Sequence, residues 1–134
     1  MSYPAKEFDF EEWFPPKFSG YGPFIIEGVE YSPNGALIIG IAGKAGNAGS
    51  AVLEFDAPIA VRIVGEGSLM KYWENGFVVR GHSIFSARNS DFLRWLDSSS
   101  AGVHASDKLT HYAIFSDDIC VEVISYASPD FTRA

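Results

Sequence analysis

Residues 90–97 read Ser-Asp-Phe-Leu-Arg-Trp-Leu-Asp, and residues 111–125 read His-Tyr-Ala-Ile-Phe-Ser-Asp-Asp-Ile-Cys-Val-Glu-Val-Ile-Ser. The apolar residues of the first segment fall on one helical face, and Ser90 is a favourable N-cap. In the second segment, two apolar runs flank a polar turn at residues 116–118, as expected for a β-hairpin. Along the second strand of this hairpin, strongly apolar residues alternate with a mixed set. We therefore expect one apolar face and one mixed face that points outward and carries Glu122. These segments predict a helix followed by a hairpin.

The remaining chain reads mainly as β-structure. Residues 1–23 mix acids, aromatics and prolines, which predicts an N-terminal arm with room for a short edge strand. Further strands are expected at 24–31, 36–41, 51–55, 59–64 and 77–85, and a second short helix at 68–74. We therefore predict an α+β fold: a mostly antiparallel sheet of about six strands, with one or two short helices packed on one face. The prediction is a single domain over residues 1–134, with an arm (1–23) and a body (24–134).

Composition limits the classes of partner. The chain has 134 residues, 47% of them hydrophobic, and 10 Lys+Arg against 17 Asp+Glu give a net charge of −7. Nucleic acids and anionic membranes attract cationic surfaces, so we expect neither as a partner. A basic protein would be attracted instead. A single cysteine, no secretory signal and no long apolar run lead us to expect a cytoplasmic protein.

No motif for catalysis or cofactor binding is complete. The Gly-x-Ala repeats of residues 40–51 lack the spacing of a phosphate or dinucleotide loop and predict a flexible hairpin loop. His82, His104 and His111 lack the spacing of a helical zinc site, and Cys120 lies inside a strand. We expect no catalytic residue, no metal and no cofactor. The alternative left open is a small enzyme that uses His82 or His111 with a nearby carboxylate.

Two acidic segments are candidate contacts for a protein partner. The arm mixes carboxylates with aromatics, and the hairpin has acids at its turn and on its second arm. A simpler interpretation is that the aromatics pack onto the sheet while the acids face water. The candidate partner-binding residues are Glu7, Asp9, Glu11, Glu12, Trp13, Asp117, Asp118 and Glu122.

From about residue 55 onward, the order of sequence segments and predicted elements resembles that of small uncharacterised bacterial proteins and of the immunity proteins of polymorphic toxins. The residues that carry the resemblance are Val61-Arg-Ile-Val-Gly-Glu66, Tyr72-Trp73, the helix at 90–96, and residues 111–115 and 118–124. The resemblance implies an acidic single domain, without catalytic residues, that neutralises a cognate toxin by covering it. We therefore expect a non-enzymatic immunity protein or inhibitor. A structural subunit that pairs through a sheet edge, as in a homodimer, is a further alternative.

Overall fold

The computed structural model describes residues 9–13, 24–43, 49–65, 84–104, 108–116 and 119–133. More than half of these residues belong to strands, and nine of them form a helix. The elements are β1 (Glu11–Glu12), β2 (Phe24–Tyr31), β3 (Leu37–Gly43), β4 (Ser50–Phe55), β5 (Ala60–Gly65), β6 (Ile84–Ala87), α2 (Asp91–Ser99), β7 (Thr110–Phe115), β8 (Ile119–Ser125) and β9 (Asp130–Arg133).

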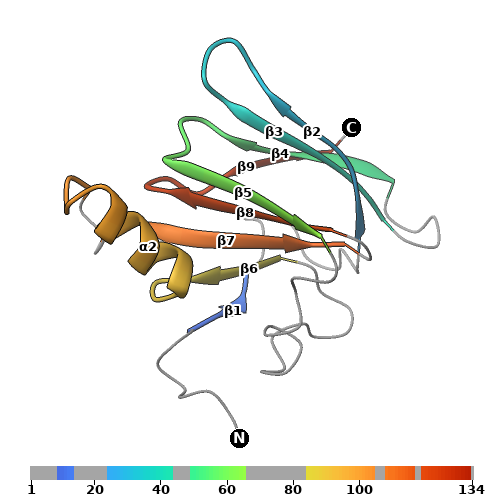
Figure 1. The fold of residues 1–134 in the computed structure, drawn as a ribbon. Coiled ribbons are helices and arrows are strands. Elements are labelled where there is room, and N and C mark those ends of the chain that lie inside the picture. The colour runs from blue at the N-terminus through green and yellow to red at the C-terminus, as the bar shows by residue number, and fades with distance from the viewer. Residues whose placement is uncertain are drawn as a thin grey trace, which may run out of the picture.

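The strands form two sheets that pack face to face (Figure 1). One sheet has five strands in the order β1-β6-β7-β8-β5, and the other has four in the order β2-β3-β4-β9. Every strand pair is antiparallel. Because β9 follows β8 closely but joins the other sheet, the chain crosses from one layer to the other after Ser125.

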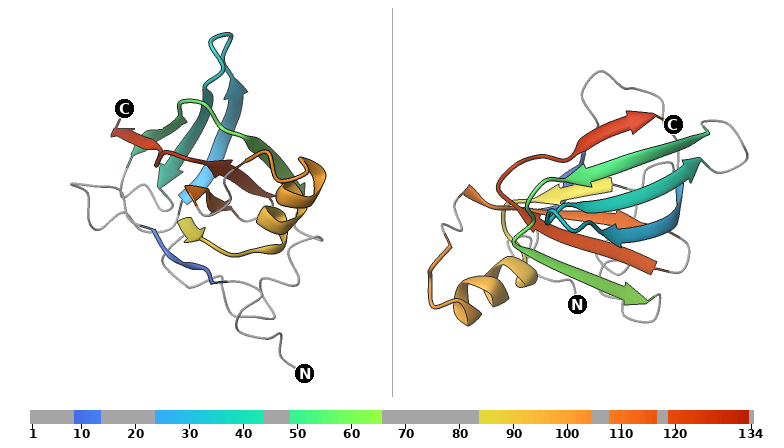
Figure 2. Two further views of the ribbon diagram at one scale, coloured as in Figure 1. Left: turned by 90° about the vertical axis from the view of Figure 1, so that its left-hand side faces the viewer. Right: turned by 90° about the horizontal axis from the view of Figure 1, so that it is seen from above.

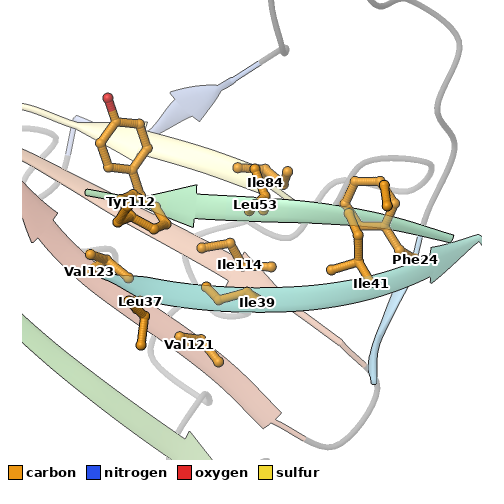
Figure 3. Close-up of a cluster of buried hydrophobic side chains, with 12 residues drawn as sticks. Phe24, Leu37, Ile39, Ile41, Leu53, Ile84, Tyr112, Ile114, Val121 and Val123 are labelled. Carbon is orange, nitrogen blue, oxygen red and sulfur yellow. The ribbon is translucent and has the colours of Figure 1, made fainter. Parts of the chain in front are cut away.

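The main core lies between the two sheets. In β3, Leu37, Ile39 and Ile41 alternate with less buried residues, so one face of the strand points into the interior. Figure 3 shows these side chains against Ile114 and Val121, which come from the opposite sheet. Burying each such side chain removes its apolar surface from water and contributes about 1.5–3 kcal/mol. This layer supplies most of the stability of the sandwich.

The outer face of the five-stranded sheet is also covered. Helix α2 lies against it (Figure 2) and packs Phe92, Leu93 and Leu96 on Ile124 of β8. Ser90 caps the helix, since its Oγ accepts a hydrogen bond from the Leu93 N–H at 3.2 Å. This face therefore has a second apolar layer, and the central strands β7 and β8 are buried on both sides.

The structure confirms a mostly antiparallel fold with a helix on one face and corrects the number of strands. In the described residues, the expected sheet of about six strands is instead two sheets with nine strands, because the apolar faces of β2–β4 cover the hairpin sheet rather than extending it. Strand β9 was not predicted. The short edge strand expected in the arm is present as β1, which pairs with β6.

Other expectations hold or lie outside the described part of the chain. The predicted strand 24–31, the helix with its Ser90 cap and the final hairpin are confirmed. Of the predicted strand 77–85, only Ile84–Ala87 can be compared, and the predicted helix 68–74 lies outside the described residues. Within the described residues, no helix is long and apolar enough to cross a membrane.

Candidate functional site

Glu122 is the residue whose placement differs most from expectation. It was predicted on an outward side, available to a partner, but its side chain is 0% exposed. The prediction of an outward Glu122 is therefore wrong. The alternation of β8 was correct, but the mixed face is covered by α2 and by Phe10 from the arm.

The buried carboxylate is held by residues from three other elements. Arg62 of β5 lies directly opposite Glu122, and its Nε and Nη2 donate to the two carboxylate oxygens at 2.7 and 3.0 Å. The Nε2 atom of His111 on β7 lies 2.9 Å from Glu122 Oε1. The Nδ1 atom of His111 lies 2.7 Å from the Oγ of Ser90, the helix N-cap. We call these four residues, Arg62, Glu122, His111 and Ser90, the buried relay.

The buried relay is a continuous chain of hydrogen bonds. An ionised Glu122 only accepts, so His111 donates from Nε2. The Oγ of Ser90 shares a hydrogen bond with Nδ1 of His111 and also accepts from the Leu93 N–H. Each of these donors meets an acceptor, which a polar network inside a core requires if it is to be stable. The relay ties β5, β8 and β7 to the first turn of α2.

Serine, histidine and a carboxylate in hydrogen-bonding sequence are also the chemical groups of a nucleophilic triad. The alternative enzyme hypothesis expected His111 to meet a carboxylate, and it does so. However, Ser90, His111 and Glu122 are all 0% exposed. Phe10 and Phe92 also contact the imidazole edge-on, with ring centroids 5.0 and 5.3 Å away. In this conformation no substrate reaches the hydroxyl, so the geometry supports a structural role.

The other histidines do not join this group. His104 lies on the turn that follows α2, and His82 lies outside the described residues. In the described part of the chain, no three metal-ligating side chains gather in one place.

Cys120 precedes Glu122 by two residues on β8, so its side chain lies on the same face of the strand. It packs with Phe85, Ala113 and Phe115 and is 0% exposed. Burial raises the pKa of its thiol well above the ordinary value of 9.0, and the nearby negative charge of Glu122 adds to this effect. The thiol is therefore protonated at neutral pH and is a core side chain rather than a nucleophile.

The acidic arm residues that the structure describes have different environments. Asp9 accepts two hydrogen bonds at 2.8 Å, from the backbone N–H groups of Arg88 and Asn89, and so fastens the arm to the loop before α2. Glu11 and Glu12 are exposed on β1. Trp13 packs against the main core, with its ring edge-on to Tyr112 at 5.9 Å.

The two aromatic residues in the described part of the arm, Phe10 and Trp13, therefore pack onto the sheet. Glu7, Asp117 and Asp118 lie outside the described residues. A partner contact by the arm stays a prediction. Of the candidate residues in the arm, Glu11 and Glu12 are the best placed for it because they are exposed.

Sequence reasoning missed an acidic row on the outer face of the four-stranded sheet. The cross-strand register aligns Glu30 of β2, Ile38 of β3, Glu54 of β4 and Asp130 of β9 side by side. All three carboxylate residues are exposed. We call Glu30, Glu54 and Asp130 the acidic row. The alternation of β2 and β4 already indicated that these acids face outward, but only the pairing of distant strands shows that they share one line.

The residues beside the acidic row are small or aliphatic. The next row contains Gly28, Gly40, Val52 and Thr132. Strands β2, β3 and β4 contain no lysine or arginine. The two rows therefore carry negative charge and no lysine or arginine, and α2 lies on the other sheet.

Comparison with protein-family models, with curated proteins and with solved structures gave no significant match.

The buried relay should show thermodynamic coupling between residues that do not bond to each other. Ser90→Ala and Glu122→Gln both disturb the hydrogen bonds of His111, so their effects should not add. We expect an interaction free energy of about 0.5–3 kcal/mol in a double-mutant cycle, measured by urea denaturation. In the control cycle, Glu122→Gln is combined with Ser116→Ala, beyond the far end of β7, and the effects should add within about 0.5 kcal/mol. Additivity in both cycles would contradict the relay.

The raised pKa of Cys120 predicts a loss of stability at alkaline pH. Well below the unfolded-state pKa of about 8.5, the thiol is protonated in both states and adds no pH dependence. As the pH rises through the unfolded-state pKa, the unfolded chain releases its proton while the folded chain keeps it. The free energy of unfolding should then fall by about 1.4 kcal/mol per pH unit from this group, up to the folded-state pKa. Cys120→Ala should lack this contribution, so equal slopes for the two proteins between about pH 9 and 10.5 would refute the assignment.

Proposed function

We propose that this chain is a non-enzymatic protein-binding domain, of the kind that neutralises a basic toxin in the bacterial cytoplasm by covering it. The observation that carries the proposal is the acidic row, three exposed carboxylates aligned across the outer face of the four-stranded sheet. The net charge of −7 and the resemblance to immunity proteins support the same conclusion.

The arrangement of the acidic row is unfavourable for the isolated protein. Glu54 and Asp130 are directly opposite on neighbouring strands, where like charges repel. Glu30 is two strand spacings, about 10 Å, from Glu54 on the same face. A lysine or arginine side chain from a partner, placed between these carboxylates, would replace repulsion by attraction. The row therefore favours a basic partner over a neutral one.

The surroundings of the row suit a flat contact. Glycines 28 and 40 have no side chains, so a partner can approach the backbone closely at the centre of the sheet. Val52, in the next row, adds apolar surface beside Glu54 and Asp130. An apolar centre with a charged surround is the usual composition of a protein–protein interface.

Neutralising one member of the row should stabilise the isolated protein. We expect Glu54→Gln to raise the free energy of unfolding by about 0.2–1 kcal/mol at low salt, since it removes repulsion from Asp130. The gain should shrink as salt screens the charges. The matched control is Glu11→Gln, an exposed strand acid that lies opposite Ser86, which should change stability very little. Destabilisation by Glu54→Gln would show that the row is not repulsive.

The same charges should control the rate of binding to the toxin. The test uses the purified product of the neighbouring gene and measures association by surface plasmon resonance. Neutralising the row with Glu30→Gln, Glu54→Gln and Asp130→Asn should slow association about tenfold or more, because electrostatic attraction accelerates encounter. The rate for the unaltered protein should fall steeply between about 0.05 and 0.5 M salt.

Two control variants locate the contact. Asp97→Asn changes an exposed acid of α2 and should leave the association rate unchanged. Glu11→Gln with Glu12→Gln tests the arm. If only the arm variant slows association, the contact is at β1 and the acidic row is not the binding face. If the product of the neighbouring gene neither binds this chain nor is neutralised by it in cells, that product is not the partner of this chain.

A further inference from the structure

Strand β5 forms one edge of the five-stranded sheet, where it pairs with β8 (Figure 2). The outward N–H and C=O groups of an edge strand can bind a strand from another chain, so natural β-proteins protect their edges. The usual protections are a very short strand, charged side chains and a β-bulge. The described part of the chain has four edge strands, and they differ in how well they are protected.

Three of these four edge strands are protected. Strand β1 has two residues, both of them glutamates. Strand β9 has four residues and carries a charged residue at each end. Strand β2 is longer, but its register against β3 shifts between Ile26 and Gly28, and Glu27 and Glu30 are exposed along it. Each of these strands is therefore a poor template for a further strand.

Strand β5 has none of these protections. Its six residues pair with β8 without a break in register. It contains no acidic residue, and the guanidinium of Arg62, its one charged residue, is bonded to Glu122 of β8. The aliphatic side chain of Ile63 is 54% exposed. An exposed, regular and apolar edge of this kind is the one most prone to pair with another strand.

The hydrogen bonds of the final hairpin show in which direction each residue of β8 bonds. The Ser116 N–H donates to the Ile119 carbonyl at 2.8 Å, so Ile119 and every second residue after it bond toward β7. Glu122 lies between those residues, so its backbone groups bond toward β5. The Ile124 carbonyl, two residues further, agrees with this assignment because it accepts from the Ile59 N–H just before β5.

The same alternation fixes the direction of the backbone groups of β5. Arg62 is the register partner of Glu122, so Arg62 and the residues two positions before and after it bond to β8. The N–H and C=O groups of Val61, Ile63 and Gly65 therefore point away from the sheet. Within the described residues, β5 has no second strand beside it to receive these groups.

A second copy of the same strand fits this edge. In an antiparallel pair about a twofold axis, the two strands meet in reverse order. When Ile63 lies opposite Ile63 of the second copy, Val61 meets Gly65, and the outward residues exchange roughly six backbone hydrogen bonds. This register also places Arg62 opposite Val64, so the two positive charges do not face each other. The strand is thus self-complementary in both hydrogen bonding and charge.

Charge favours a second copy over the basic partner considered above. A basic chain is attracted to the acidic row, which lies on the other sheet, whereas β5 offers it only an arginine. Two copies with a net charge of −7 each repel at long range. They can approach most closely along a strand that has no carboxylate, and β5 is such a strand.

We propose that β5 pairs with β5 of a second copy and so forms a symmetric dimer in which the two five-stranded sheets become continuous. The dimer goes beyond the proposed function, because it does not use the acidic row. One strand from each chain makes a small interface, so the dimer is weak, with a Kd on the order of 100 μM.

Sedimentation equilibrium of the full chain tests for the dimer. Between about 10 μM and 1 mM protein, the average mass should rise from 14.7 kDa toward twice that value. Raising the salt from about 0.05 to 0.5 M should strengthen the dimer severalfold, because salt screens the repulsion between like-charged copies. Toxin binding through the acidic row should weaken over the same range. A mass of 14.7 kDa at every concentration would overturn the proposal.

Amide exchange measured by NMR locates the contact in the unaltered chain. The N–H groups of Val61, Ile63 and Gly65 should exchange about threefold more slowly at 1 mM than at about 50 μM protein. The N–H groups of Arg62 and Val64 should change less, because they already bond to β8. Slowing confined to β2 or β9 would place the contact at another edge and overturn the proposal.

A pair of matched variants tests the edge by substitution. Ile63→Lys introduces a charge into the β5 contact and should raise the dimer Kd at least about tenfold. Ile25→Lys makes the same change at an aliphatic residue of β2 that is 41% exposed, and it should leave the Kd unchanged. Circular dichroism checks that both variants are folded. An equal Kd for the two variants would contradict the proposal. These measurements use this chain alone, so failure of the neighbouring gene product to bind does not affect them.

Discussion

The ion pair between Arg62 and Glu122 is the constraint on which the arrangement of this fold depends. A carboxylate in the interior is tolerable only if it is paired and hydrogen-bonded. Pairing fixes the register of β5 against β8, because a slip of one residue would turn Glu122 toward the core between the sheets. His111 and Ser90 extend the same requirement to β7 and to the start of α2. One buried charge therefore sets the relative positions of three strands and the helix.

Local features of the sequence predicted the elements well. The boundaries of β2, the Ser90 cap and the hairpin of β7 and β8 each depend on a few neighbouring residues, and each is confirmed. The division into two sheets was not predictable in this way, because alternation identifies an apolar face but not what covers it. Strand β9 was missed for a related reason: it is four residues long, and its one apolar anchor is Phe131.

The candidate site shows the same limit more sharply. Glu122 was expected in solvent because its counter-ion is 60 residues away and carries no local signal. The acidic row was missed because it combines β2, β4 and β9, which are not consecutive in the chain. Clusters of acids in the sequence led to the arm instead, where Asp9 serves an internal contact. Charge alignment in a sheet is a property of register, which a single sequence does not disclose.

The attachment of the arm has a kinetic consequence. Asp9 binds the backbone of Arg88 and Asn89, 79 and 80 residues away, and β1 pairs with β6. Arg62 likewise meets Glu122 across 60 residues. A chain with such connections must close long loops before their contacts repay the lost entropy, which places it among the slow-folding β-proteins, in milliseconds to seconds. Until those loops close, the edges of both sheets are open, so this protein is most vulnerable to aggregation while it folds.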